Sequence, residues 1–146
     1  MSKSLLTDLY EMTMLAGYQR EAMHDKPAAF EMYFREMPYQ GGYAVFAGLQ
    51  PALEYLSGLL FTEEDVQYLG SLGLFDDDFL EFLKKFRFRG RVIAPREGEI
   101  VFPGEPLLTV EGTLAETQFV ETVLLNIINF QTLVATKAAR LAHAAG

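Results

Sequence analysis

Residues 113–146 read TLAETQFVETVLLNIINFQTLVATKAARLAHAAG, and the apolar pattern of this stretch decides the fold. Its apolar residues recur at steps of three and four, which places them on one helix face: Val120, Val123, Leu124, Ile127 and Ile128. From Thr122 onward the polar residues also fall at helical steps, on a narrow and mostly uncharged strip: Asn126, Asn129, Thr136 and Arg140. A solvated helix face usually carries Lys and Glu, so we expect this strip to be buried against groups that satisfy its hydrogen bonds.

The rest of the sequence offers no obvious partner for this strip. We therefore expect residues 113–146 to form helices that lead into a further part of a larger protein, and the 146-residue chain to be an incomplete fragment. This hypothesis predicts that an apolar helix face stays exposed.

The composition indicates a folded protein whose main partners are not polyanions. Half of the residues are hydrophobic, and the formal net charge is −8. Diffuse acidity argues against nucleic acid and anionic membranes, because both bind clustered Lys and Arg. The basic run at residues 84–91 lies beside Asp76, Asp77, Asp78 and Glu81, and we interpret it as a strand edge or turn.

The sequence also argues against export and membrane insertion. Asp8 and Glu11 come too early for a signal peptide. Polar residues interrupt the long apolar region, which argues against a membrane span: Asn126, Asn129, Gln131 and Lys137. Because the chain has no cysteine, disulfides and thiolate metal ligands are excluded. We expect a soluble, cytoplasmic protein.

Periodicity in the first 90 residues predicts alternating helices and strands. Helical spacing covers residues 5–23, 51–60, 62–72 and 76–86, and strand alternation covers residues 29–35 and 43–47, with a turn at 38–42 between the strands. In the first helix, Thr7 and Asp8 supply capping groups, and the buried face is expected at Leu5, Leu9, Met12 and Ala16. Pro51 starts the second helix, and Thr62 opens the third with a capping-box pattern.

The periodicity changes after Phe86. Glycines and a Pro-Gly pair separate three short strands around Ile93, residues 100–102 and residues 107–110, which indicates a small barrel or sandwich. The predicted fold class is α/β, with an α+β domain that contains this β-sandwich or barrel-like module in residues 1–112, and with outgoing helices in residues 113–146.

Few residues carry recognisable chemistry. His24 and His143 are far apart, and Asp76, Asp77 and Asp78 are typical of a negatively charged helix start, so no metal site is predicted. The pair Gly41-Gly42 lacks the Lys and Ser/Thr of a phosphate-binding loop. No nucleophile motif is present, so the catalytic residues stay unknown at this stage.

Two features remain as candidate sites. Asp8 and Tyr10 place a carboxylate and an aromatic ring on the first turn of a helix, and the alternative is a capped helix with a surface tyrosine. Lys137 and Arg140 lie among small residues of the last helix, and the alternative is a helix that only packs.

Four blocks in order make the whole string resemble a known family. They are TDLYEMTM at 7–14, GGYAVFAGL at 41–49, FPGEPLL at 102–108 and LLNIINFQTLVATKAAR at 124–140. Together they closely resemble the N-terminal portion of nicotinate phosphoribosyltransferases, over essentially all 146 residues.

The resemblance implies an enzyme of pyridine nucleotide salvage. Such enzymes join nicotinate to 5-phosphoribosyl 1-diphosphate, giving nicotinate mononucleotide and diphosphate, with coupled ATP hydrolysis. It further implies a following irregular α/β barrel and a homodimer with active sites at the subunit interface. ATP and Mg²⁺ are implied for the complete enzyme, and the 146-residue chain alone is expected to be inactive.

The resemblance also assigns residues. Tyr10 matches a tyrosine that packs on the nicotinate ring across the dimer, and Asp8 lies beside it. Lys137 and Arg140 match the helix that leads into the barrel and are secondary candidates for substrate contact. Neither His24 nor His143 matches the family's phosphorylatable histidine, which belongs to the barrel with most of the phosphate-binding residues.

Two alternatives stay open. One is a relative that uses nicotinamide, for which an acidic group in the barrel would be the discriminator. The other is a non-catalytic binding module built on the strands of residues 88–112, which lacks the exposed lysine that such a module needs to carry a cofactor.

Overall fold

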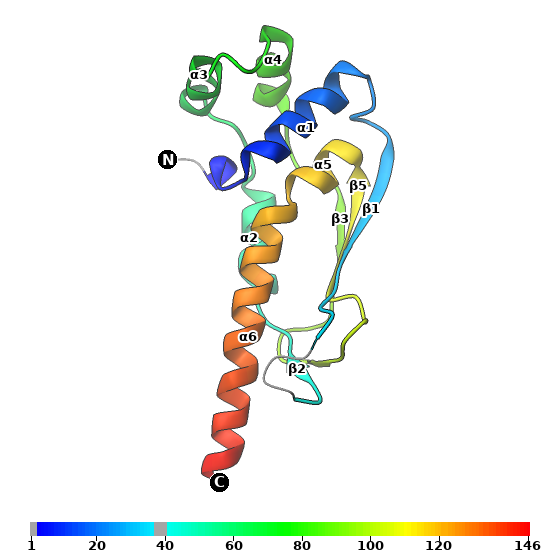
Figure 1. Ribbon diagram of the computed structural model, residues 1–146, viewed down its shortest axis with the longest axis vertical. Coiled ribbons are helices and arrows are strands. Elements are labelled where there is room, and N and C mark those ends of the chain that lie inside the picture. Colours follow the sequence, from blue (N-terminus) through cyan, green and yellow to red (C-terminus); the bar gives the residue numbers. More distant parts are fainter. Residues whose placement is uncertain (1–2, 37–40) are drawn as a thin grey trace.

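A computed structural model describes residues 3–36 and 41–146 of the chain (Figure 1). The elements in order are η1 (Lys3–Leu5), α1 (Leu9–Arg20), β1 (Pro27–Met32), β2 (Ala44–Val45), α2 (Leu49–Ser57), α3 (Glu63–Ser71), α4 (Asp77–Lys85), β3 (Arg91–Ile93), β4 (Ile100–Val101), β5 (Leu108–Thr113), α5 (Leu114–Phe119) and α6 (Glu121–Ala145). Most of the turn predicted at 38–42 falls on residues 38–40, which lie outside the described residues. The mixture of helices and strands confirms the predicted α/β class.

The strands form two small antiparallel sheets. One has the order β1-β5-β3, with Phe30 opposite Val110, and the other pairs β2 with β4. Side chains of β1 alternate as predicted, so that Phe30 and Met32 lie on the more buried side. Because β5 pairs with β1 along its whole length, the β-rich part of the chain shares a sheet with the N-terminal part.

Aromatic rings pack α4 and the residue Phe61 before α3 against the end of α5. Phe61, Phe86 and Phe119 contact one another at ring-centroid distances of 5.3–5.9 Å, and Phe79 and Phe82 extend the cluster along α4. Such tilted and edge-to-face pairs add to the stability that burial of the rings already provides. The start of α3 has the predicted capping box, formed by Thr62 and Asp65.

The first helix differs from the prediction in two ways. It begins at Leu9, after the 3₁₀ turn η1, and it buries Glu11, Met12 and Leu15. Leu9 was predicted to be buried but is 54% exposed, because the face turned toward α5 and α6 is the one that carries Glu11. Asp8 takes the N-cap position without a side-chain capping bond, so the predicted cap is wrong there.

The start of α2 also differs from the prediction. Pro51 is the third residue of the helix and does not open it, since α2 begins at Leu49. Gly48 stands at the N-cap with φ 107°, a conformation that a residue with a Cβ rarely adopts. Residues 84–91 form the end of α4, a connection and the start of edge strand β3, so the interpretation as a strand edge or turn is confirmed only at Arg91 and is wrong for the helical Lys84 and Lys85.

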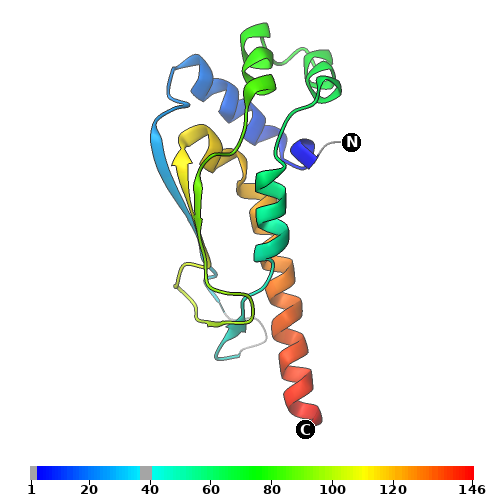
Figure 2. The same cartoon turned by 180° about the vertical axis from the view of Figure 1, so that it is seen from behind.

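The final helices confirm the pattern at residues 113–146, with a break at Val120 between α5 and α6. Figures 1 and 2 show α6 running beside α2 and then extending beyond the body of the molecule. Several large apolar residues of α6 are exposed, as the sequence predicts: Leu125, Phe130, Leu133, Val134 and Leu141.

The polar strip of α6 is buried only where β2 crosses the helix. Thr136 has no exposed surface, accepts a hydrogen bond from the Val45 N–H at 2.9 Å and donates to the Thr132 carbonyl. Thr132 accepts from the Ala47 N–H at 3.2 Å. Asn126 and Asn129 are exposed, so the prediction of burial is wrong for them; Asn129 lines an open hollow together with Ala44 and Thr132.

No helix among residues 3–36 and 41–146 is long and apolar enough to cross a membrane.

The threonine contacts with β2 lead to a stability prediction. Thr136→Val removes the acceptor of the Val45 N–H and leaves this partly buried donor without a partner, so we expect the free energy of unfolding to fall by about 1–3 kcal/mol. Urea unfolding measures this loss. In the control, Thr13→Val changes an exposed helical threonine and should alter the free energy by less than about 0.5 kcal/mol. Equal losses in the two variants would contradict the prediction.

Candidate functional site

The start of α1 lies against the start of α6, which brings the two best sequence candidates together. Asp8 precedes α1 directly, and its Oδ2 lies 3.3 Å from the Thr122 hydroxyl in the first turn of α6. Tyr10 is the second residue of α1 and is 49% exposed. The two segments are more than 110 residues apart in the sequence, so only the fold creates this arrangement.

Glu11 joins the two helices and was missed by the sequence analysis. Its side chain has no exposed surface, and its Oε1 accepts from the Thr122 N–H at 3.0 Å and from the Thr122 hydroxyl at 2.9 Å. Its Oε2 accepts from the Thr7 hydroxyl. Since Val120, the N-cap of α6, contributes no side-chain cap, Glu11 satisfies a backbone donor that the helix start leaves open. Helical spacing from Met12 and Leu15 could have placed Glu11 on the buried face.

Negative charge gathers around Tyr10. A hydrogen bond with the Thr122 side chain lowers the pKa of Tyr10, but desolvation and the carboxylates of Glu11, Glu121 and Asp8 raise it more, so that its pKa lies above the usual value. Burial, followed by repulsion from Glu11, raises the pKa of Glu121. The electrostatic potential at this end of α1 is therefore unfavourable for an anion.

A groove runs beside Asp8 along the start of α6. Its polar groups come from Lys3, Asp8, Thr122 and Asn126, and its apolar walls come from η1, α2 and α6. Tyr55 also lines the groove, and its hydroxyl is buried with no hydrogen-bond partner among the described residues. Burial, together with the charge of Glu11, strongly raises the pKa of Tyr55.

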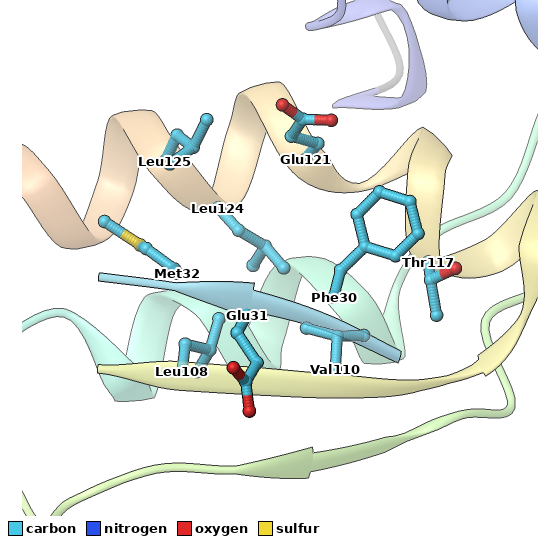
Figure 3. Close-up of a pocket in the computed structure, with 9 residues that line it drawn as sticks. All are labelled: Phe30, Glu31, Met32, Leu108, Val110, Thr117, Glu121, Leu124 and Leu125. Carbon is cyan, nitrogen blue, oxygen red and sulfur yellow. The ribbon is translucent and has the colours of Figure 1, made fainter. Parts of the chain in front are cut away.

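A second hollow lies between the sheet and the helices α5 and α6 (Figure 3). It is small, about 110 Å³, and its walls are mainly apolar: Phe30, Met32, Leu108, Val110, Leu124 and Leu125. Glu121, Thr117 and Glu31 add polar atoms, and Figure 3 shows Glu121 on the α6 side of the hollow. This volume is far below that of a pocket for a nucleotide.

Lys137 and Arg140 lie well away from Tyr10 and Asp8. Thr122 and Lys137 are both on α6, and at 1.5 Å per residue they are about 22 Å apart along its axis. Lys137 is exposed, whereas the Arg140 guanidinium lies so close to Gly41 that a Cβ there would clash with it. Within one copy of the chain, these residues do not form one site with Tyr10.

The histidines and carboxylates do not assemble a metal site in the part of the chain that the structure describes. His24 lies 3.2 Å from Asp25, and His143 stands in the last turn of α6. The residues present therefore do not fit the Mg²⁺ that the family resemblance implies, and we derive no step through a metal from them.

Comparison with known proteins identifies the family, and the matched residues include both α1 and the start of α6. The family described as nicotinate phosphoribosyltransferase (NAPRTase) N-terminal domain matches residues 5–129. The chain belongs to the nicotinate phosphoribosyltransferase family. The chain is 48% identical to the nicotinate phosphoribosyltransferase of Bacillus subtilis (strain 168), over 96% of this chain and 29% of the relative.

Solved structures extend the comparison. The crystal structure of human nicotinic acid phosphoribosyltransferase superposes with a TM-score of 0.91 at 41% identity, over 97% of this chain and 29% of the human chain. A nicotinate-nucleotide pyrophosphorylase from Pyrococcus furiosus shares the fold, with a TM-score of 0.62 at 20% identity, over 86% of this chain and 24% of that chain. The chain thus spans less than a third of the length of the family members that it matches.

The raised pKa of Glu121 leads to a pH prediction. Since the folded state holds this proton more tightly than the unfolded state, the contribution of Glu121 to stability falls as the pH rises from its ordinary value of 4.5 through the raised pKa. Glu121→Gln should remove this decline. The free energy of unfolding of the variant should therefore rise relative to that of the parent between about pH 4 and about pH 7.

Urea unfolding across this pH range measures the difference. Glu64→Gln is the matched control, because Glu64 lies exposed in the first turn of α3. If the two variants follow the parent with the same pH dependence, burial of Glu121 has no such effect.

Proposed function

We propose that this chain forms the N-terminal part of a cytoplasmic nicotinate phosphoribosyltransferase. The enzyme would join nicotinate to 5-phosphoribosyl 1-diphosphate, with coupled ATP hydrolysis, in NAD biosynthesis. The family match over residues 5–129 and the names of the relatives support this proposal. Nicotinate, 5-phosphoribosyl 1-diphosphate and ATP would be the small-molecule substrates.

Tyr10 is proposed as the platform for the nicotinate ring, and its exposure carries this assignment. The ring of Tyr10 is half exposed near the start of α1. The next residue, Glu11, is fixed against α6 by its hydrogen bonds to Thr122. Within residues 3–36 and 41–146 no aromatic ring stacks on Tyr10. A planar pyridine ring can occupy such a face at a centroid separation of about 4.5–7 Å.

The charges around Tyr10 constrain how nicotinate would bind there. Asp8 and Glu11 repel a carboxylate, so the nicotinate carboxylate would point away from α1 and toward cationic groups. Lys3 is the cation of the adjoining groove, whereas Lys137 and Arg140 lie about 22 Å and about 27 Å from Thr122 along α6. The site therefore needs cationic groups from outside this copy of residues 3–146, which the unmatched part of the enzyme or the second subunit of the proposed homodimer would supply.

The chemical step would depend on groups that this segment does not supply. Loss of diphosphate leaves an oxocarbenium-like ribosyl centre, which positioned Arg, Lys and metal ions stabilise. We propose that these groups, and the sites for ATP and Mg²⁺, belong to the two thirds of the relatives' length that the chain does not match.

The binding-module alternative loses its basis in the fold. Strand β5 pairs with both β1 and β3, so the strands of residues 88–112 do not make an independent sandwich. The nicotinamide alternative is not favoured, because the curated relatives from bacteria, worm and mouse carry the name of the nicotinate enzyme.

The role of Tyr10 can be tested in a full-length enzyme that contains this segment. Tyr10→Ala removes the ring face, so we expect kcat/KM for nicotinate to fall about 10- to 100-fold, equivalent to about 1.4–2.8 kcal/mol. Tyr10→Phe keeps the face and should stay within about threefold of the parent. Steady-state kinetics with nicotinate as the varied substrate provide the measurement.

Tyr68→Ala serves as the control, since Tyr68 is an exposed tyrosine of α3. An unchanged KM and kcat in Tyr10→Ala would rule out the proposed contact. A similar loss in Tyr68→Ala would point to a general effect of removing a surface ring.

A further inference from the structure

We infer that Glu11 is a positioning residue for the nicotinate site, because its buried carboxylate fixes how α1 presents Tyr10 and Asp8 beside α6. The inference rests on the proposed role of Tyr10. It adds a residue that acts through Tyr10 and does not itself face the groove, since its side chain has no exposed surface.

The surroundings of Glu11 show that its carboxylate has a specific partner. No Lys, Arg or His of the described residues forms an ion pair with it. A buried carboxylate without a counter-charge is unfavourable unless donors surround it. Here the donors are the Thr122 N–H, the Thr122 hydroxyl and the Thr7 hydroxyl, and the first of these belongs to the open N-terminal end of α6.

Thr122 is the point on α6 to which this end of α1 is attached. Its hydroxyl can donate its single hydrogen to either of two carboxylates, Glu11 at 2.9 Å or Asp8 at 3.3 Å, and its side chain also forms a hydrogen bond with Tyr10. The shorter distance favours Glu11, which is also held by the backbone N–H at 3.0 Å. Tyr10 directly precedes Glu11 in α1, so this contact fixes the backbone of Tyr10 relative to α6.

Loss of the carboxylate would free the first turn of α1. In Glu11→Ala the Thr122 N–H and the Thr7 hydroxyl lose their acceptor, the Thr122 hydroxyl keeps only Asp8, and the ring of Tyr10 can shift relative to α6. In Glu11→Gln the side-chain oxygen can still accept both bonds from Thr122, and its amide can donate to the Thr7 hydroxyl. The geometry therefore depends on the shape and acceptor of the side chain more than on its charge.

Kinetics of the full-length enzyme test this role. We expect Glu11→Ala to raise the KM for nicotinate about tenfold while the KM for 5-phosphoribosyl 1-diphosphate stays within about twofold, because only the ring platform moves. Glu11→Gln should bring the KM for nicotinate back to within about threefold of the parent. Glu116→Ala is the matched control: Glu116 is a buried carboxylate that caps α5 through Thr113, so its loss should affect stability without a selective change in the KM for nicotinate.

A double-mutant cycle separates positioning from a direct contact. If Glu11 acts through Tyr10, adding Glu11→Ala to Tyr10→Ala changes the KM for nicotinate by less than about twofold. Independent, multiplying effects would overturn the inference, as would a Glu11→Ala enzyme with an unchanged KM or with equal rises for both substrates. If Glu11→Ala does not fold, Thr122→Val is made in the Tyr10→Phe enzyme, which already lacks the hydrogen bond between Tyr10 and Thr122. The change keeps the backbone donor to Glu11 and removes the hydroxyl donor, so a selective rise of about threefold is expected, and no rise would overturn the inference.

The same experiments distinguish the two proposals. If Tyr10→Ala leaves the kinetics unchanged, both the proposed ring platform and the positioning role of Glu11 are refuted. If Tyr10→Ala is impaired but Glu11→Ala has unchanged kinetics, only the positioning role is refuted.

Discussion

The carboxylate of Glu11 at the start of α6 is the contact on which the arrangement of the N-terminal elements depends. It joins residues 111 positions apart and does so with no exposed surface. A helix start exposes backbone donors and the positive end of the helix dipole, and a buried carboxylate is a strong partner for both. The Glu11 carboxylate and the backbone N–H at the start of α6 satisfy each other's hydrogen bonds, so burying either one without the other would destabilise the fold.

A second attachment holds α6 further along its length. There the hydroxyls of Thr132 and Thr136 bond to backbone groups of β2 and its neighbour Ala47, so that a two-stranded sheet is tied to the helix by side chains. With Glu11 near one end and β2 near the middle, α6 is fixed at two points, while its last turns extend past the body (Figure 1). The exposed apolar residue Leu141 belongs to this outer part, whereas the exposed Phe130 and Val134 lie at the level of the second attachment.

Sequence analysis predicted the elements well where the signal was local. The capping box of Thr62 and Asp65 and the alternation of Phe30 and Met32 depend on neighbours in the sequence, and both were confirmed. Leu9 and Asn129 were predicted to be buried and are exposed, because burial is decided by which element packs on which face. The periodicity of apolar residues in a sequence does not show which elements make such tertiary contacts.

The candidate site shows the same division. A sequence motif was enough to select Tyr10 and Asp8 as candidates. It could not predict that they lie close to α6. The sequence analysis used Glu11 only as an argument against a signal peptide, because nothing local indicates that the backbone N–H of a residue 111 positions later needs an acceptor. The pairing of β1 with β5, from Pro27 opposite Thr113 to Met32 opposite Leu108, is equally non-local.

The electrostatics of the site follow from this construction. Capping α6 with Glu11 leaves negative charge under Tyr10, and Asp8 and Glu121 add to it, so the ring face best suits a ligand whose charge lies elsewhere. An anionic substrate would be held by its ring here and by its charged groups on another surface. Tyr10 is half exposed in a single copy, so under the proposed function the uncovered part of its ring is the part that a second surface would close over.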